Sequence, residues 1–301
     1  MTELTPSTRS TASGTRADAG AGAGAGACAG RVALVTGVAQ GIGRRVAEVL
    51  AEEGYALVLA DIVDPADTLT SVRAAGADAV AVVGDVASEA YVTGLADQVR
   101  ERFGRVDALV NNAGVSLLVP AEETTADQWR RVLDVNLTGP FLLSRAVGRL
   151  MLAAGGGSIV NIASIAGLHG VSDRAAYNAS KHGLIGLTRT LAGEWGGRGV
   201  RVNAVCPGWV KTEMDAADQA SGGYTDEDIV DRVPMGRFAA PDDIAQAVSF
   251  LADPARSGFV NGTALPVDGG WTADASWNSL RRRKRPDPDR NSDPDLGDSD
   301  R

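Results

Sequence analysis

The sequence predicts an α/β fold, a single doubly wound domain with a seven-stranded parallel sheet flanked by helices on both faces. Three observations support this prediction. Short apolar runs alternate along the chain with longer segments of helical periodicity. The apolar runs are nearly continuous, which is typical of strands that are buried on both sides. Residues 31–278 contain no segment with the composition of a linker, so one domain is expected.

The first half of this domain is expected to hold four strands joined by three helices. Each expected strand is a run of Val, Leu and Ala, and each expected helix carries apolar residues three or four positions apart. In chain order, we predict strands at Val32–Thr36, 56–60, Ala79–Val83 and 108–110, with helices at 41–53, 66–75 and 88–103 between them.

The second half continues the alternation with longer helices and one irregular stretch. Parallel strands require a crossover between them, and these helices supply it on either face of the sheet. In chain order, we predict a long helix at 126–153, a strand at 158–162, a helix at Ala175–Trp195, a strand at 200–205, an irregular stretch, a helix at 241–251 and a closing strand at 263–267.

The ends of the 301-residue chain differ from the domain in composition. Residues 1–30 end in an alternating Ala/Gly run and residues 279–301 are rich in Pro, Asp and Arg, so we predict two disordered tails. The net charge of −9 disfavours nucleic acid as a partner. No apolar run is long enough to cross a bilayer, and the N-terminal residues lack the apolar core of a secretory signal. We therefore expect no membrane association and a cytoplasmic protein.

The segment after the first expected strand is suited to binding phosphate groups. It reads T-G-V-A-Q-G-I-G at positions 36–43 and leads directly into a helix. Glycine lets the chain turn sharply, lets the backbone approach a pyrophosphate and lets helix and strand pack closely. The helix N-terminus adds free N–H groups and a positive dipole end. We predict a Rossmann-type dinucleotide site that includes Gly37, Gln40, Gly41, Ile42 and Gly43.

Asp61 ends the second expected strand, 18 residues after the last of these glycines. A carboxylate at this point accepts hydrogen bonds from the adenosine ribose hydroxyls and repels a 2′-phosphate. The next residues, Ile62 and Val63, supply no compensating cation. The cofactor is therefore predicted to be NAD(H), with NADP(H) disfavoured. Asp85 and Val86 follow the third strand and are placed to contact the adenine.

Tyr177 and Lys181 are four residues apart in an expected helix and so share one face. A free tyrosine titrates near ~10, and lowering its pKa to about 7 takes roughly 3 units, which a nearby cation in a dry site can supply. Alone, the pair favours the simpler interpretation of a surface lysine beside a half-buried tyrosine, because Tyr-x-x-x-Lys often arises by chance. Its meaning depends on the other motifs.

Taken together, the motifs resemble those of the short-chain dehydrogenase/reductase family over residues 31–277. The matching segments, in chain order, are T-G-x-x-x-G-I-G at 36–43, N-N-A-G at 111–114, Asn136, Ser164 just after the fifth strand, Tyr177-x-x-x-Lys181, and Pro207-Gly208 with Thr212.

The resemblance implies a division of labour in the site. Tyr177 exchanges a proton with the substrate oxygen while hydride moves to or from the nicotinamide, and Ser164 holds the same oxygen. Lys181 lowers the pKa of Tyr177 and binds the nicotinamide ribose, and Asn136 supports a water that links Lys181 to solvent. The expected cofactor contacts beyond the first two strands are Asn112, Ala113, Gly114, Tyr177, Lys181, Pro207, Gly208, Val210 and Thr212.

Other reactive residue types carry weaker expectations. Cys206 is expected to be a small buried residue and not a nucleophile. His169 follows Ser164 by five residues and could face the substrate. No cluster of His, Cys and carboxylate residues has metal-ligand spacing, so no catalytic metal is expected.

Residues 210–236 are expected to form a lid that sets substrate specificity, with a flexible point at Ser221-Gly222-Gly223. The segment is acidic and has few apolar anchors, which favours a small neutral substrate such as a sugar, polyol or hydroxyketone. The two tryptophans near residue 277 suggest, by family analogy, a homotetramer or homodimer.

Three functions remain open. The first is an NAD-dependent dehydrogenase of secondary alcohols. The second is a carbonyl reductase of the 3-oxoacyl-(acyl carrier protein) type, for which Arg130, Arg131 and Arg174 are available cations. The third is a non-catalytic dinucleotide-binding regulator, which is disfavoured because the catalytic residues are all present.

Overall fold

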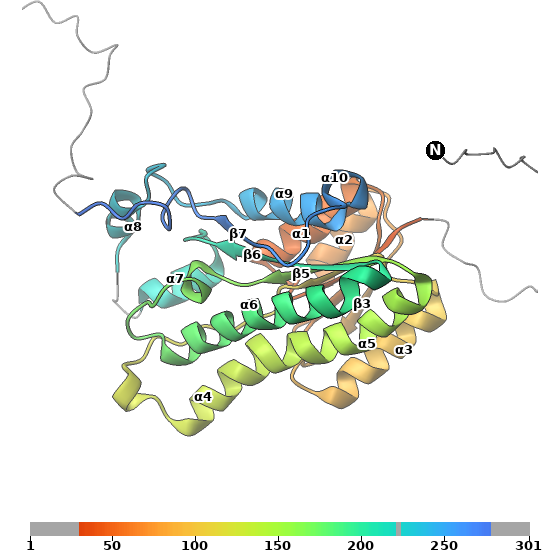
Figure 1. Cartoon of the computed structure of the whole chain (residues 1–301), viewed down its shortest axis with the longest axis horizontal. Coiled ribbons are helices and arrows are strands. Elements are labelled where there is room, and N and C mark those ends of the chain that lie inside the picture. The colour runs from red at the N-terminus through yellow and green to blue at the C-terminus, as the bar shows by residue number, and fades with distance from the viewer. Residues whose placement is uncertain (1–29, 221–223, 278–301) are drawn as a thin grey trace, which may run out of the picture.

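A computed structural model describes residues 30–220 and 224–277 of the chain. They form one seven-stranded parallel sheet in the order β3-β2-β1-β4-β5-β6-β7 (Figure 1), which confirms the predicted fold class. The predictions for the two tails (Gly30 apart) and for the flexible point at 221–223 lie outside the described residues. The strands are β1 (Val32–Thr36), β2 (Ala56–Asp61), β3 (Ala79–Val83), β4 (Ala108–Asn111), β5 (Gly157–Ile162), β6 (Val200–Pro207) and β7 (Ala264–Val267).

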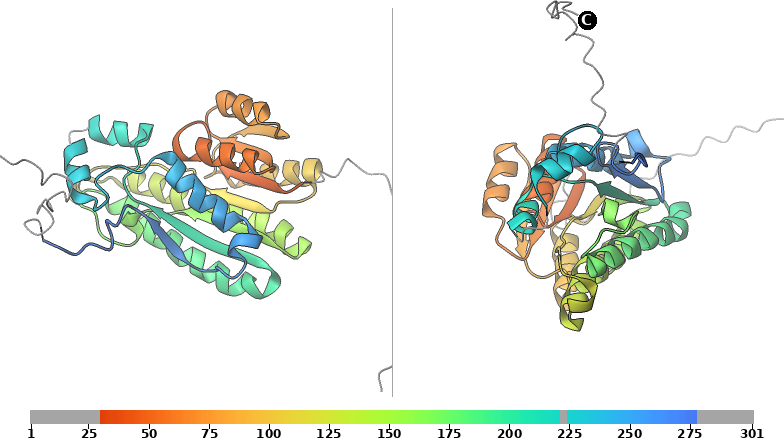
Figure 2. Two further views of the ribbon diagram at one scale, coloured as in Figure 1. Left: turned by 90° about the horizontal axis from the view of Figure 1, so that it is seen from above. Right: turned by 90° about the vertical axis from the view of Figure 1, so that its left-hand side faces the viewer.

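Helices cover both faces of the sheet (Figure 2). Successive residues of β1 point to opposite faces, so Ala33 and Val35 pack in one hydrophobic cluster and Val32 and Leu34 in the other. The first cluster joins the sheet to α1 (Gly41–Glu52), α2 (Ala66–Ala74) and α9 (Pro241–Ala252), and the second joins it to α3 (Glu89–Phe103), α5 (Gly139–Ala154) and α6 (Ala175–Trp195). Burial on both faces explains why the strands are nearly continuous apolar runs.

The expected long helix at 126–153 is interrupted. It consists of α4 (Ala126–Leu133), a π-helical turn at Asp134–Thr138 and α5. A π turn adds one residue to a turn without breaking the helix, so the apolar periodicity on either side does not reveal it. The prediction of one uninterrupted α-helix was therefore wrong at this point.

The expected irregular stretch before residue 241 also contains helices. These are α7 (Glu213–Ala220) and α8 (Asp226–Arg232), and α10 (Pro254–Ser257) follows α9. Helix α8 starts with a capping box in which Thr225 and Asp228 bond each other's backbone amides. Among the helices of residues 30–220 and 224–277, none combines the length and apolarity needed to span a bilayer.

Strand order decides where a ligand can enter. β1 lies between β2 and β4, so β2 and β3 extend the sheet on one side of β1 and β4 to β7 extend it on the other. Crevices in parallel sheets of this kind open at the carboxyl ends of the strands on either side of such a switch point. The glycine-rich segment follows the carboxyl end of β1 and therefore lies at this crevice.

Candidate active site

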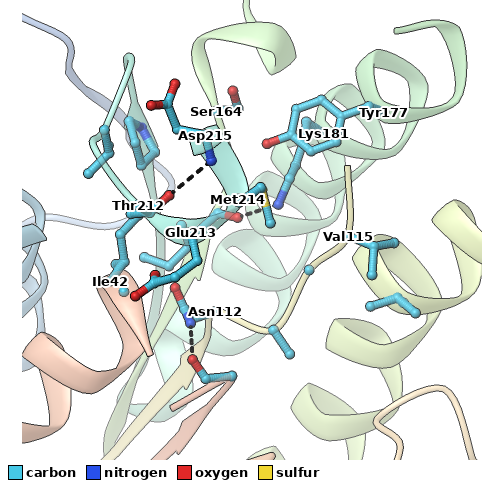
Figure 3. Close-up of a pocket in the computed structure, with 18 of the residues that line it drawn as sticks. Ile42, Asn112, Val115, Ser164, Tyr177, Lys181, Thr212, Glu213, Met214 and Asp215 are labelled. Carbon is cyan, nitrogen blue, oxygen red and sulfur yellow. Dashed lines mark hydrogen bonds between the residues drawn. The ribbon is translucent and has the colours of Figure 1, made fainter. Parts of the chain in front are cut away.

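A cavity of about 440 Å³ opens at the carboxyl ends of the strands, and the first residues of helix α7 line it (Figure 3). Its lining is drawn from the glycine-rich segment, the ends of β2 to β6, the start of α6, residues between 207 and 218, and Tyr224. Volumes of this size are typical of small-molecule sites. The sequence-predicted residues that line it are Gly37, Gln40, Gly41, Ile42, Asp61, Asp85, Val86, Asn112, Ala113, Gly114, Ser164, Tyr177, Lys181, Pro207, Gly208, Val210 and Thr212.

Two predicted site residues, Gly43 and Asn136, do not line the cavity. A Cβ atom on Gly43 would lie only 2.0 Å from the carbonyl oxygen of Gly37, so this glycine allows α1 to pack against the turn. Gly43 therefore has a packing role, and its contact with the cofactor stays a prediction. Asn136 is fully buried behind the cavity wall, and its contacts are described below.

The glycine-rich end of the cavity fits a pyrophosphate. Gly37 has a φ of +69°, and a Cβ atom there would lie 2.8 Å from the Cα of Ala113, so only glycine is tolerated. The side-chain amide of Asn112 donates to the carbonyl oxygens of Thr36 and Gly37 at 2.9 Å each, which holds the turn in place. No side chain caps α1, so the amides of its first turn are open to a bound anion.

Asp61 lies at the edge of this cavity, where β2 ends. Its carboxylate accepts hydrogen bonds from the backbone amides of Ala39 (2.8 Å) and Val63 (3.0 Å), which fix its orientation. The cation Arg131 also lines the cavity, and it donates to Asp85 at 2.7 Å. Burial works to raise the pKa of Asp85, but the amide of Ala87 and the guanidinium of Arg131 outweigh it and hold that pKa below its ordinary value.

The other end of the cavity gathers three polar side chains. Ser164 follows β5, and its hydroxyl accepts a hydrogen bond from the amide of Ala166 at 3.1 Å and lies close enough to Tyr177 to act on the pKa of that phenol. Lys181 lies one turn after Tyr177 in α6, with its Nζ 5.5 Å from the centroid of the Tyr177 ring. That ammonium donates to the carbonyl oxygen of Ile162 at 2.8 Å. Figure 3 shows the hydroxyl and the ammonium on the same side of α6.

Burial moves the pKa values of this pair in opposite directions. It raises the pKa of Tyr177 above its ordinary value, against the opposing effects of the Ser164 hydrogen bond and the charge of Arg174. It lowers the pKa of Lys181 to about 8. The expected lowering of the Tyr177 pKa by Lys181 is therefore not present in this structure. The ammonium lies beside the ring, where its strongest contact is the Ile162 carbonyl.

Asn136 acts through its neighbours. It is the third residue of the π-helical turn, and its side chain accepts from the amide of Val115 and donates to the carbonyl of Val115, at 2.9 Å each. It also donates to the hydroxyl of Ser180 at 3.2 Å. A Cβ on Gly114 would lie 3.3 Å from Asn136 Oδ1 and 3.7 Å from Lys181 Nζ. Asn136 thus positions the loop after β4 against Lys181.

Sequence reasoning did not identify a polar group beside Tyr177. The Arg174 guanidinium donates to the hydroxyl of Ser116 at 2.6 Å and to the carboxylate of Asp218 at 2.7 Å, and it lies 5.9 Å from the centroid of the Tyr177 ring. Arg174 and Asp218 line the cavity. The available signal was the position of Arg174, three residues before the tyrosine. No local pattern could have predicted that Asp218 pairs with Arg174, because Asp218 lies in α7 and Arg174 at the start of α6.

Two other expectations have clear outcomes. Cys206 is fully buried, which confirms the expected small buried residue, and burial raises the pKa of its thiol to about 11. His169 is exposed and does not line the cavity, and its ring contacts Trp271 edge-on at 5.9 Å. The hypothesis that His169 faces the substrate is therefore withdrawn.

Comparison with known proteins places this geometry in a family. A family model described as enoyl-(acyl carrier protein) reductase matches residues 37–272. The chain is 45% identical over 246 residues to D-threitol dehydrogenase of Mycolicibacterium smegmatis, covering 80% of this chain and 93% of that protein. It is 43% identical over 245 residues to cis-4-hydroxycyclohexanecarboxylate dehydrogenase of Sinomonas cyclohexanicum, with coverages of 81% and 97%.

A solved structure extends the comparison to three dimensions. It is described as an NAD(P)-dependent gluconate 5-dehydrogenase from Beutenbergia cavernae with NADP bound at low occupancy. The two chains are 44% identical and superpose with a TM-score of 0.77. The alignment covers 82% of this chain and 99% of that one. The family match, the identities and the arrangement of Ser164, Tyr177 and Lys181 agree, and the chain belongs to the short-chain dehydrogenase/reductase family.

Proposed function

We propose that the protein is an NAD-dependent oxidoreductase that interconverts a secondary alcohol and a ketone on a small polar substrate. The observation that carries this proposal is the convergence of Ser164, Tyr177 and Lys181 at one end of a cavity whose other end suits a dinucleotide. The relatives named above are named for a polyol and for a hydroxycyclohexanecarboxylate, and both compounds carry a secondary hydroxyl group.

The proposed roles follow from what each group can donate or accept. The hydroxyls of Ser164 and Tyr177 both hydrogen-bond the reacting oxygen, because the two side chains line the same end of the cavity. In the reductive direction, Tyr177 gives its proton to the oxygen as alkoxide charge develops there, and its raised pKa keeps the phenol protonated until that step. In the oxidative direction, the phenolate needs positive charge nearby, and Lys181 and Arg174 supply it. The bound nicotinamide would supply the hydride donor or acceptor.

Replacement of Tyr177 by Phe tests the catalytic assignment. We expect kcat to fall by at least about 10³-fold, because proton transfer and oxygen binding are lost together, while NADH still binds. NADH fluorescence measures binding, and absorbance at the nicotinamide band measures turnover. Tyr91→Phe is the matched control, because its hydroxyl bonds only the Val82 carbonyl outside the cavity. Retained turnover in Tyr177→Phe would contradict the proposal.

The NAD preference rests on Asp61. Its carboxylate is held at the cavity edge by two amides, and the exposed neighbours Ile62 and Val63 offer no cation for a 2′-phosphate. We expect kcat/KM to be at least about tenfold higher with NAD than with NADP, and Asp61→Ser to narrow this ratio. The solved relative holds NADP, so a wild-type preference for NADP is the specific result that would overturn the assignment.

The substrate is proposed to be a sugar, polyol or hydroxyketone, since the lining contributed by α7 includes three carboxylates. An NAD-reduction screen over these compounds identifies it. Thioesters of 3-oxoacyl groups, tested in reverse, represent the alternative suggested by the description of the family model. Arg130 and Arg131 are already paired with Asp127 and Asp85, which weakens the case for docking an acidic carrier. Tight NADH binding with no turnover of any compound would instead favour the third function, a non-catalytic dinucleotide-binding regulator.

A further inference from the structure

Arg174, Ser116 and Asp218 form a closed triangle of hydrogen bonds. Arg174 donates to Ser116 at 2.6 Å and to Asp218 at 2.7 Å, and the Ser116 hydroxyl donates to the same carboxylate oxygen of Asp218 at 3.1 Å. The three residues come from the start of α6, the loop after β4 and helix α7. The triangle therefore joins the segment over the cavity to the helix that carries Tyr177.

The triangle lies within reach of the reacting groups. The Arg174 guanidinium is 5.9 Å from the centroid of the Tyr177 ring and 5.8 Å from that of Trp209. Its side chain is 7% exposed and that of Asp218 is 15% exposed. Arg174, Asp218, Tyr177 and Trp209 all line the cavity. A substrate whose oxygen lies at Tyr177 would extend toward this pair.

The charge of Arg174 is permanent, so the fold must provide a counter-ion in this buried position. Asp218 is that counter-ion, and the pair is neutral as a whole. A substrate carboxylate arriving here would meet an arginine that is already paired, with the carboxylate of Asp218 beside it. Glu213 and Asp215 add two further acidic side chains to the same wall. A neutral hydroxyl faces no such repulsion and can bond either partner.

We propose that Asp218 is a specificity-determining residue that, by pairing with Arg174, selects uncharged polyol-type substrates and rejects their carboxylate counterparts. The inference rests on the proposed function and deepens it, because it concerns the charge of the substrate. Relatives of this chain act on a neutral polyol and on a hydroxycarboxylate, so the family scaffold accommodates both classes. One carboxylate on α7 then decides between them in this chain.

Matched substrate pairs test the proposal. Each pair consists of a neutral alcohol and the acid in which one CH2OH group is replaced by a carboxylate: threitol with threonate, glycerol with glycerate, and cis-4-(hydroxymethyl)cyclohexanol with cis-4-hydroxycyclohexanecarboxylate. For the wild type, we expect kcat/KM to be at least about tenfold higher for the neutral member of each active pair. A wild type that prefers the acid overturns the inference without any variant, because the substrate carboxylate would then bind although Asp218 is paired with Arg174.

Asp218→Asn keeps the shape of the side chain and removes its charge. We expect the neutral-to-acid ratio of kcat/KM to fall by at least about tenfold, because Arg174 becomes available to the carboxylate. Asp218→Glu, which keeps the charge, should retain the wild-type preference. Adding Arg174→Gln to Asp218→Asn should abolish the gain for the acid. Asp226→Asn is the matched control, since Asp226 is exposed, pairs with Lys211 and does not line the cavity.

The pH profile provides a second readout. Ser164, Lys181, Arg174 and Asp218 are the polar groups facing Tyr177, and of these the charge of Asp218 acts to raise the Tyr177 pKa. Asp218→Asn should therefore shift the rise of kcat/KM for alcohol oxidation to lower pH, and Asp226→Asn should not. A merely structural role for Asp218 would lower activity without moving this rise.

The outcomes separate the two proposals. If wild-type protein reduces NAD with none of the neutral compounds or their acids, the proposed function fails and the inference fails with it. If the wild type is active but Asp218→Asn changes neither the neutral-to-acid ratio nor the pH profile, only the inference fails.

Discussion

Single residues in this site take their properties from burial as much as from residue type. Lys181 is the clearest example, because its side chain is 4% exposed and its ammonium has a backbone carbonyl as hydrogen-bond acceptor. Burial lowers its pKa from 10.5 to about 8. The charge that the proposed chemistry requires is therefore maintained at a cost to folding, as is common at functional sites.

This cost predicts an unusual stability profile for Lys181→Met. The folded pKa lies below the unfolded one, so between about pH 8 and 10.5 the unfolded chain binds more protons and wild-type stability rises with pH. Below pH 8 the full cost is present. At pH 7 we expect the variant to be inactive but more stable by about 2 kcal/mol, after allowing for the lost hydrogen bond.

Urea unfolding of both proteins at pH 7 and at pH 10 measures this effect. The gain in stability of Lys181→Met over the wild type should shrink as the pH rises from about 8 to 10.5. Lys211→Met is the control, because Lys211 is exposed and its carboxylate partners raise its pKa. A variant that is less stable than the wild type at pH 7 would show that burial of Lys181 carries no such cost.

At the scale of elements, close approaches between helices, strands and loops define the cavity. Helix α1 can start beside the turn after β1 only because Gly43 has no Cβ. The π-helical turn at Asp134–Thr138 directs Asn136 into the loop after β4, where it substitutes for a backbone partner of Val115. π turns of this kind are frequent at functional sites.

Two glycine-to-alanine variants separate these packing effects from helix propensity. Gly43→Ala places a Cβ 2.0 Å from the Gly37 carbonyl, so we expect the turn to be displaced and NADH binding to fall by at least about tenfold. Gly94→Ala, in the middle of α3, meets no atom within 4 Å. It should raise stability by about 0.5–1 kcal/mol and leave NADH binding unchanged. Thermal unfolding and NADH titration of both variants test these expectations, and unchanged NADH affinity in Gly43→Ala would contradict the packing role.

At the scale of the whole molecule, the sheet order brings together residues that are far apart in the chain. The cavity joins segments between positions 37 and 224 because the carboxyl ends of the strands meet at one edge. The same order separates the dinucleotide end, near β1 and β2, from the chemical end, near β5 and β6. Relatives with different substrates can thus share one cofactor arrangement and differ in the segment that covers it.

Self-association is also predicted at this scale. Large apolar side chains are exposed on α4 (Trp129, 38%), on α5 (Phe141, 41%) and after α10 (Phe259). Exposed apolar side chains favour symmetric contacts between copies of a chain. Light scattering should give the mass of a homotetramer or homodimer of the 30.9 kDa chain, and a monomer at micromolar concentration would remove the prediction.

The success of the sequence predictions depended on whether the relevant interactions were local. The strand runs at 32–36 and 56–60 were visible because a buried parallel strand is apolar throughout. Tyr177 and Lys181 could be placed on one face because helix geometry relates positions four apart. The π turn was missed because one extra residue leaves the flanking periodicity intact.

The sequence by itself thus determined the fold class, the dinucleotide motif, the family and the groups that carry the proposed chemistry, since each depends on residue types at short spacing. Only the tertiary structure decided that Arg174 pairs with Asp218, that His169 does not line the cavity and that burial raises the pKa of Tyr177. These features depend on contacts between distant segments and on exclusion of water. The energies of such contacts and of burial are set by three-dimensional position, which spacing along the chain does not encode.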